Sequence, residues 1–118
     1  MSEIPVTVTA VSRGRLSVMP QLGEVQAEHR FTIPAGLCPR SGNPISGTLT
    51  LKYAAREVLE VVTLHRAYLD ATKEARSLEG IGRLLSVWCA EALSVRVVWL
   101  VDAEIKPGPQ RLIVEGTS

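Results

Sequence analysis

The stretch VQAEHRFTI, from Val25 to Ile33, decides the fold class of this chain. Apolar and polar side chains alternate through the whole run. One face carries Val25, Ala27, His29, Phe31 and Ile33, and the other carries Gln26, Glu28, Arg30 and Thr32. A period of two residues is typical of a strand with one buried face. The segment therefore predicts a half-buried strand that another layer of structure must cover.

Further periodic segments follow this strand. Thr48 to Tyr53 alternate again and predict a second strand. From Glu57 the spacing becomes helical, with His65 in the gap of the apolar stripe. That stripe holds Val58, Val61, Val62, Tyr68 and Leu69. After a polar break at 73–77, Ser77 is placed to cap a second helix. The apolar face of this helix holds Ile81, Leu84, Leu85, Trp88 and Ala92.

The end of the chain returns to strand-forming sequence. Val95 to Val101 is rich in β-branched residues, KPGP at 106–109 predicts a turn, and Arg111 to Glu115 predicts the last strand. Val6 to Val11 is a further candidate strand. The order ββααββ predicts an α+β fold, an antiparallel sheet with two helices on one face. Because the sheet edges and the second face need protection, we expect a homo-oligomer.

Length and composition indicate one domain over 1–118, with its core at 24–118 and an N-terminal strand or arm at 1–23. Apolar residues make up 46% and charged residues 21% of the chain, as in ordinary soluble proteins. The net charge of +1 argues against an extended phosphate-binding face. No apolar run approaches the ~18–20 residues of a membrane span. The N-terminus does not resemble a signal peptide, and two cysteines form no disulfide framework, so we expect a cytoplasmic protein without membrane partners.

A loop rich in proline and glycine, GLCPRSGNPISG from Gly36 to Gly47, holds one of the cysteines, Cys38. An exposed loop thiol near a cation such as Arg40 is placed to act as a nucleophile. The alternative is a small apolar loop residue without a chemical role. Cys89 lies inside the second predicted helix and is expected to be structural. Since no histidine or cysteine cluster has the spacing of metal ligands, we expect no bound metal.

Glu79 opens the second predicted helix, between Leu78 and the glycine pair of Gly80-Ile81-Gly82. One interpretation is a first-turn acid stabilised by the helix dipole. Each glycine costs ~1 kcal/mol relative to alanine in a helix, which favours a close approach by a ligand or another backbone. A carboxylate in that place could accept two parallel N–H donors, as a guanine-like edge offers. The other prominent side chains are interpreted as core residues: His65, Trp88 and Trp99.

The predicted order, the loop Cys38-Pro39-Arg40-Ser41-Gly42-Asn43-Pro44 and the glutamate at the start of the second helix resemble the tunnelling fold (T-fold). Within that fold they are most similar to the QueF nitrile reductases and their shorter QueF-like relatives, the archaeosine-pathway amidinotransferases. Those families carry a loop of the form C-P-x-S/T-G-Q-P-D and, further along the chain, an H-E pair. The resemblance runs from about Val25 to the C-terminus. It implies an oligomeric barrel with ligand sites between subunits.

In these families the cysteine adds to the nitrile of 7-cyano-7-deazaguanine (preQ0), giving a covalent thioimide, and the glutamate binds the guanine-like edge of the ring. The resemblance implies that Cys38 is the catalytic nucleophile and that Glu79 binds the substrate. The aspartate of the family loop, which helps to activate the thiol and to protonate the nitrile nitrogen, falls on Ile45. The histidine of the H-E pair falls on Leu78.

The reductases also carry a segment E-S-K-S-L-K that is linked to substrate and NADPH binding. It corresponds here to residues 60–65, of which Glu60 and Leu64 are unchanged. Glu60 is therefore a further substrate-binding candidate, and no use of NADPH is expected. The resemblance favours amidine formation from ammonia or an amine over reduction to the aminomethyl product. The substrate is preQ0 or a tRNA or DNA that carries it.

Two other functions stay open. A non-catalytic T-fold protein would bind a purine or a pterin through Glu79. A pterin-pathway enzyme of the same fold would need metal-binding histidines or a catalytic lysine, and the chain has only two histidines, His29 and His65.

Overall fold

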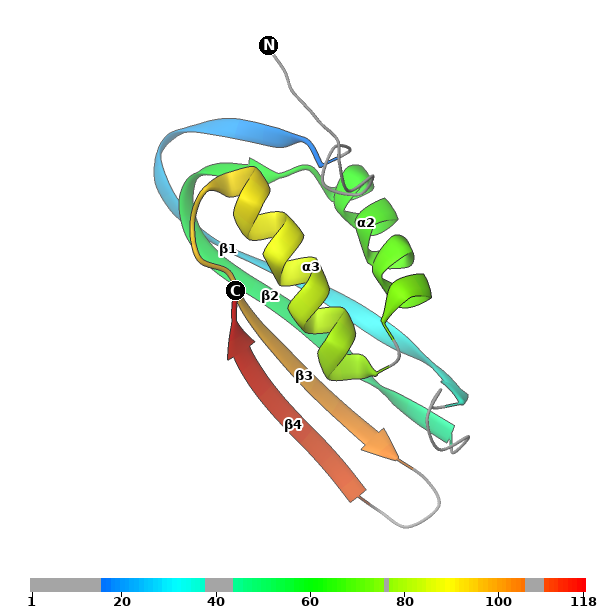
Figure 1. The fold of residues 1–118 in the computed structure, drawn as a ribbon. Helices are drawn as coiled ribbons and strands as arrows, with labels where there is room; N and C mark the ends of the chain where they lie inside the picture. Colours follow the sequence, from blue (N-terminus) through cyan, green and yellow to red (C-terminus); the bar gives the residue numbers. More distant parts are fainter. Residues whose placement is uncertain (1–15, 38–43, 76, 106–109) are drawn as a thin grey trace.

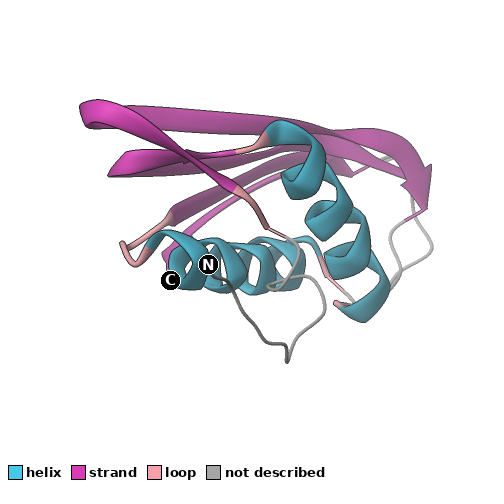
Figure 2. Cartoon of the chain, turned by 90° about the horizontal axis from the view of Figure 1, so that it is seen from above, coloured by secondary structure: helices cyan, strands magenta, loops and turns pink. Residues whose placement is uncertain are grey.

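The computed structural model describes residues 16–37, 44–75, 77–105 and 110–118. Its elements are β1 (Val18–Leu37), β2 (Pro44–Leu59), α2 (Val61–Glu74), α3 (Leu78–Leu93), β3 (Val98–Ile105) and β4 (Gln110–Thr117). The strands form one antiparallel sheet in the order β1-β2-β3-β4, and both helices lie on the same face of it (Figures 1 and 2). The predicted α+β class and the ββααββ layout are confirmed.

Burial alternates along β1 with the same two-residue period from which the sequence predicted this strand. Residues of the apolar set at 25–33 are half-buried on the helix side, and those of the polar set are exposed. Register continues this pattern across the sheet, because Phe31 pairs with Leu49, and Leu49 pairs with Val101. Leu49 and Val101 are fully buried under the helices. The core is therefore a single layer between the sheet and α2 and α3.

Trp99 on β3 is one of the two tryptophans of this core, and glycines make room for it. A Cβ atom added at Gly82 on α3 would lie 2.7 Å from Trp99 Cε3, and one added at Gly116 on β4 would lie 2.5 Å from Trp99 Cζ2. Both distances are shorter than carbon atoms tolerate, so the indole fits only between two residues without side chains. Trp99 and Trp88 are 2% and 5% exposed, which confirms that both are core residues.

The prediction that helical structure begins at Glu57 is wrong. The strand β2 continues to Leu59, and Val58 and Leu59 pair with Met19 and Val18 of β1. The sequence pattern did not predict this extension of β2. The extension pairs with the first residues of β1, which begins at Val18, before the alternating segment at 25–33. Similarly, β3 starts at Val98 rather than at Val95.

The predicted core face of the first helix is confirmed at Tyr68 and wrong at three other positions. Val61, Val62 and Leu69 are 64%, 54% and 44% exposed. The buried face of α2 consists of Leu64, Ala67, Tyr68 and Ala71. Two alanines make up half of that face, while the larger apolar residues that suggested a stripe point to solvent. His65 is exposed as well, so its interpretation as a core histidine is wrong.

The second helix follows its prediction closely. Ser77 caps α3, since its Oγ accepts a hydrogen bond from the Gly80 N–H at 3.1 Å. Leu85 and Trp88 are buried on the predicted face. The helix ends at Ser94, which has a left-handed backbone with φ of 58°.

The predicted strand at Val6 to Val11 and the predicted turn at 106–109 lie outside the described residues. Ile105 and Gln110, on either side of that turn, pair with each other in the β3–β4 hairpin. Neither helix in the described part of the chain has the length and apolar character needed to cross a bilayer.

Candidate functional site

Glu79 lies in the first turn of α3, directly after the Ser77 cap and Leu78. Its side chain is half-buried and makes no hydrogen bond or ion pair with another residue that the structure describes. The positive end of the helix dipole favours a carboxylate at this position. Among the described residues the carboxylate has no side-chain or backbone partner, which leaves it available for its predicted role in substrate binding.

The glycines that flank this acid do not need a ligand to explain them. Gly82 is required by the close approach of Trp99, and a Cβ atom at Gly80 would lie 3.0 Å from the capping Oγ of Ser77. Of the two explanations offered by the sequence, the approach of another part of the chain accounts for both residues. The approaching group at Gly82 is a side chain rather than a backbone.

Glu60 has a structural duty in this chain, as the N-cap of α2 (Val61–Glu74). Its carboxylate oxygens accept hydrogen bonds from the Val62 N–H at 2.8 Å and from the Thr63 N–H at 2.9 Å. These two bonds, followed by smaller effects of the Thr63 hydroxyl and Arg66, lower the pKa of the carboxyl group. Capping alone accounts for a glutamate at position 60. Its role in substrate binding stays a prediction.

The loop that holds Cys38 lies outside the described residues, but both of its anchors are described. Leu37, the last residue of β1, pairs with Pro44, the first residue of β2, and Gly36 pairs with Ile45. The loop therefore closes a hairpin at one end of the sheet. Figure 1 shows that the amino end of α3, where Glu79 lies, is directed toward that same end.

The two positions where the chain departs from the QueF-like loop and H-E pair are both described. Ile45 belongs to β2 and pairs with Ile105 of β3 on its other side. Leu78 is the first residue of α3, and its side chain packs against the hydrophobic core. An apolar residue at position 78 thus has a packing role that a histidine would not fill equally well.

Cys89 is structural, as predicted. Its side chain has no solvent-exposed surface, and burial raises the pKa of its thiol to about 12. A thiol with that pKa is not a nucleophile near neutral pH. Within the described residues no group of three or more His, Cys, Asp and Glu side chains comes together in the way a metal site requires.

His29 and Tyr53 form a polar pair inside the apolar layer that the sequence did not reveal. His29 Nε2 lies 2.8 Å from Tyr53 Oη, and Oη also accepts a hydrogen bond from the Leu59 N–H at 2.9 Å. Both residues stand on the predicted buried faces of their strands. The sequence did contain one signal for this pair, which was His29 on the buried face of its predicted strand. A buried polar group needs a hydrogen-bond partner.

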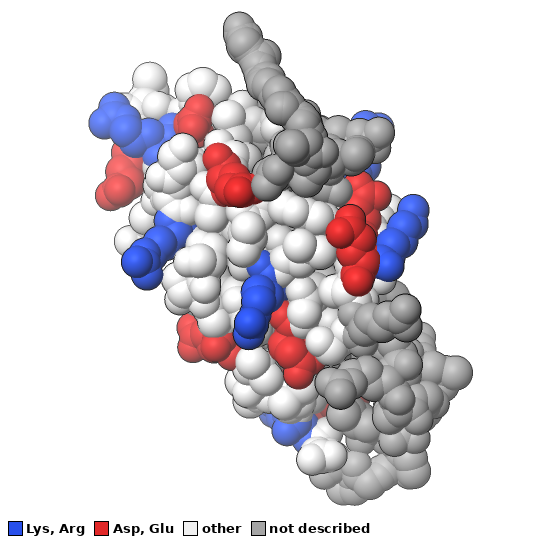
Figure 3. Space-filling view, in the orientation of Figure 1, with Lys and Arg blue, Asp and Glu red and all other residues white. Residues whose placement is uncertain are grey.

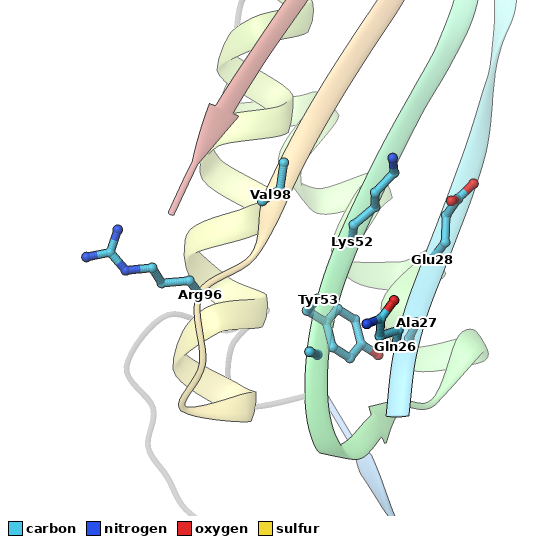
Figure 4. A pocket seen from close by; sticks show the side chains of 8 residues that line it. Gln26, Ala27, Glu28, Lys52, Tyr53, Arg96 and Val98 are labelled. Carbon is cyan, nitrogen blue, oxygen red and sulfur yellow. The ribbon is translucent and has the colours of Figure 1, made fainter. Parts of the chain in front are cut away.

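A hollow of about 520 Å³ lies on the sheet beside this pair. It is lined by Gln26, Ala27, Glu28, Lys52, Tyr53, Ala54, Arg96 and Val98 (Figure 4). Its size would suit a small molecule. However, Figure 4 shows the Arg96 side chain extending away from Lys52, so the two cations do not converge on one point. Lys52 is also seven strand residues from Ile45, about 23 Å along β2. The hollow is therefore distinct from the Cys38 end of the sheet.

The charges on the helix-covered side of the molecule are mixed. Figure 3 shows lysines and arginines interspersed with aspartates and glutamates, without a continuous field of one sign on the face in view. The described residues of that face form no basic stripe of the kind on which nucleic-acid binding usually depends. No family model matches the chain, and no curated protein matches it either.

Proposed function

We propose that the chain is a QueF-like enzyme that acts on the nitrile of 7-cyano-7-deazaguanine through a covalent thioimide at Cys38. The product is an amidine formed with ammonia or an amine. The observation that carries the proposal is the pairing of two features at one end of a ββααββ sheet. The two described anchors of the Cys-Pro loop, Leu37 and Pro44, pair there, and the first turn of α3, which carries Glu79, is directed toward them.

The reaction needs no redox step. The Cys38 thiolate adds to the nitrile carbon, so a C–S bond forms, one C–N π bond breaks, and the nitrogen takes a proton. Ammonia then adds to the same carbon, the C–S bond breaks, and the sulfur leaves as thiolate. The sum is nitrile plus ammonia giving amidine, and the enzyme is regenerated. Reduction would need a hydride donor such as NADPH, and the segment linked to NADPH binding is largely replaced at 60–65.

Glu79 has the chemistry to recognise the purine-like edge of this substrate. A carboxylate accepts two parallel N–H donors, one from a ring nitrogen and one from an exocyclic amine. The half-buried setting of Glu79 strengthens such a bond relative to one in bulk water. Subunit contacts would complete the pocket, because a homo-oligomeric T-fold barrel brings another copy of the chain to this end of the sheet.

A second candidate, a binding protein without catalysis, is favoured by one observation. Leu78 packs on the core where the families have a histidine, and Ile45 replaces the aspartate that would protonate the nitrile nitrogen. Such a protein would hold a purine or a pterin through Glu79 and form no covalent bond. The two functions differ in their dependence on Cys38.

Product analysis separates these functions. The protein is incubated with 7-cyano-7-deazaguanine and ammonium, and the small molecules are analysed by mass spectrometry. We expect a product heavier than the substrate by one ammonia with the native chain and none with Cys38→Ala. Calorimetry on Cys38→Ala then measures binding alone, which Glu79→Gln should weaken and Glu115→Gln should not. Binding without product in the native chain would support the second candidate and contradict the first.

A further inference from the structure

The phenol of Tyr53 joins two strands and the start of a helix. Tyr53 Oη lies 2.8 Å from His29 Nε2 of β1 and receives the Leu59 N–H of its own strand at 2.9 Å. The two rings are stacked, with centroids 5.5 Å apart. Tyr53 is 6% exposed and Leu59 is fully buried, so neither hydrogen bond has water as a ready substitute.

Only one of these two hydrogen bonds has its direction fixed by its donor. A backbone N–H only donates, so Tyr53 Oη accepts from Leu59. The buried phenol proton needs an acceptor, and His29 Nε2 is the acceptor that the described residues offer, so we assign the proton to that hydrogen bond. That arrangement requires a neutral His29 with its proton on Nδ1. Burial lowers the pKa of His29 and, as its largest effect, raises the pKa of Tyr53. Both rings are therefore neutral near pH 7, as the hydrogen bonds demand.

The Leu59 amide stands at the junction between β2 and α2. The next residue, Glu60, is the N-cap of α2, and its own N–H donates to the Ser17 carbonyl at 2.9 Å. Ser17 in turn donates its N–H to Thr63 Oγ1 at 3.1 Å. The side chain of Tyr53 thus reaches the last residue of β2 and holds the backbone next to the Glu60 cap.

We propose that His29 and Tyr53 form a proton-controlled latch on the β2–α2 junction. When His29 takes up a proton, its Nε2–H becomes a second donor to the oxygen that already accepts from the Leu59 N–H. The Tyr53 O–H then loses its acceptor, and an imidazolium charge stands in an apolar layer. The latch opens, and Leu59 and the Glu60 cap loosen with it.

The surroundings offer the imidazolium little compensation. The titratable groups that the described residues place in the buried layer with His29 are Tyr53 on β2, Tyr68 on α2 and Cys89 on α3, and all are neutral at pH 7. The charged neighbours Glu28 and Arg30 lie on the opposite face of β1, where they pair with each other at 2.7 Å. No ion pair therefore offsets the free-energy cost of protonating His29, and the cost appears as lost hydrogen bonds at the β2–α2 junction.

Hydrogen exchange of the Leu59 amide between pH 8 and pH 5, followed by NMR and corrected for the intrinsic rate, tests the latch. The His29 ring signals report its titration in the same samples. The folded pKa of His29 lies below its ordinary value of 6.5. Between those two values the unfolded junction binds more protons, so protection should fall by about tenfold per pH unit on acidification and stay constant above pH 6.5. Thr50, in the centre of β2, is the control amide.

Variants separate the latch from general acid sensitivity. His29→Gln keeps an acceptor for the tyrosine and cannot be protonated, so its Leu59 protection should not change with pH. His65→Gln, at an exposed histidine, should keep the native pH profile. Tyr53→Phe should leave Leu59 unprotected at every pH. Constant Leu59 protection in the native chain while His29 titrates, or an unchanged slope in His29→Gln, would overturn the proposal. No arm involves Cys38, so the outcome is independent of the proposed catalytic function.

Discussion

At the scale of single residues, several positions in this chain are fixed by what they touch rather than by chemistry with a ligand. Gly82 and Gly116 leave space for the Trp99 indole, and Cys89 fills a fully buried position with an inert thiol. Glu79 is different, because its half-buried carboxylate has no partner among the described residues. That contrast is what singles out Glu79 as a candidate for ligand binding.

Alanine at Gly82 should destabilise the fold more than alanine at Gly80. The new methyl group at Gly82 would lie 2.7 Å from Trp99, whereas the contacts at Gly80 are 3.0 Å and longer. Overpacking of this kind costs about 1–3 kcal/mol, more than the ~1 kcal/mol that alanine gains in a helix. Urea unfolding of the two variants and the native chain measures the difference. A Gly82→Ala variant as stable as Gly80→Ala would show that the indole is not confined.

At the scale of elements, the order and type of the helices and strands were predictable, but the face of α2 was not. Strict alternation at Val25 to Ile33 indicates a strand and nothing else. The cap at Ser77 is a local hydrogen bond that serine at this position predicts. The stripe on α2 was misread because two small residues, Ala67 and Ala71, form much of its buried face. Burial of alanine depends on how closely the helix approaches the sheet, which is a tertiary property.

A pair of leucines on α2 tests which face is buried. Leu64 is 2% exposed and Leu69 is 44% exposed. Leu64→Ala should reduce the free energy of unfolding by about 2–5 kcal/mol, the usual range for a buried leucine. Leu69→Ala should change it by less than about 1 kcal/mol, because the removed atoms were largely in water. Thermal or urea denaturation provides both values. Similar losses for the two variants would contradict the orientation of α2.

The Glu60 cap should make the start of α2 sensitive to acid. Two backbone hydrogen bonds lower the pKa of Glu60 below its ordinary value of 4.5, so its stabilising effect is complete above that value. The effect is lost as the pH falls through the lowered pKa. Glu60→Ala should therefore unfold at lower urea than the native chain at pH 7, and the gap should close in acid. Glu57→Ala is the matched control, and a gap that persists at low pH would exclude this origin.

The candidate site was predictable only in outline. The Cys-Pro loop and the position of Glu79 are visible in the sequence because their residue types are unusual in those places. The roles of Glu60 and Gly82 were not visible, since a cap and a close contact with an indole depend on which residues the fold brings together. For the same reason the hydrogen bonds of Tyr53 could not be inferred, although His29 on a buried strand face pointed to a partner.

At the scale of the whole molecule, β1 and β4 are the edge strands of the sheet, and none of the described helices covers its second face. The edge strand β4 carries Ile113 with 60% of its surface exposed. Edges of this kind pair with other strands unless charge or shape prevents it. The proposed function also depends on such pairing, because the ligand sites of a T-fold barrel lie between subunits.

Light scattering coupled to size exclusion should thus give a mass that is a multiple of the 12.8 kDa chain. Ile113→Lys places a charge on the edge strand and should shift the distribution toward smaller species. Val87→Lys, at a 39% exposed position on α3, should leave it unchanged. A native chain that stays monomeric at micromolar concentration would remove the structural basis for sites between subunits.

The most direct test of the central claim is the intact mass of the protein after incubation with 7-cyano-7-deazaguanine alone. We predict an increase equal to one ligand per chain, which is absent in Cys38→Ala and preserved in Cys89→Ala. An unchanged mass in the native chain, or the same adduct in Cys38→Ala, would contradict covalent chemistry at Cys38.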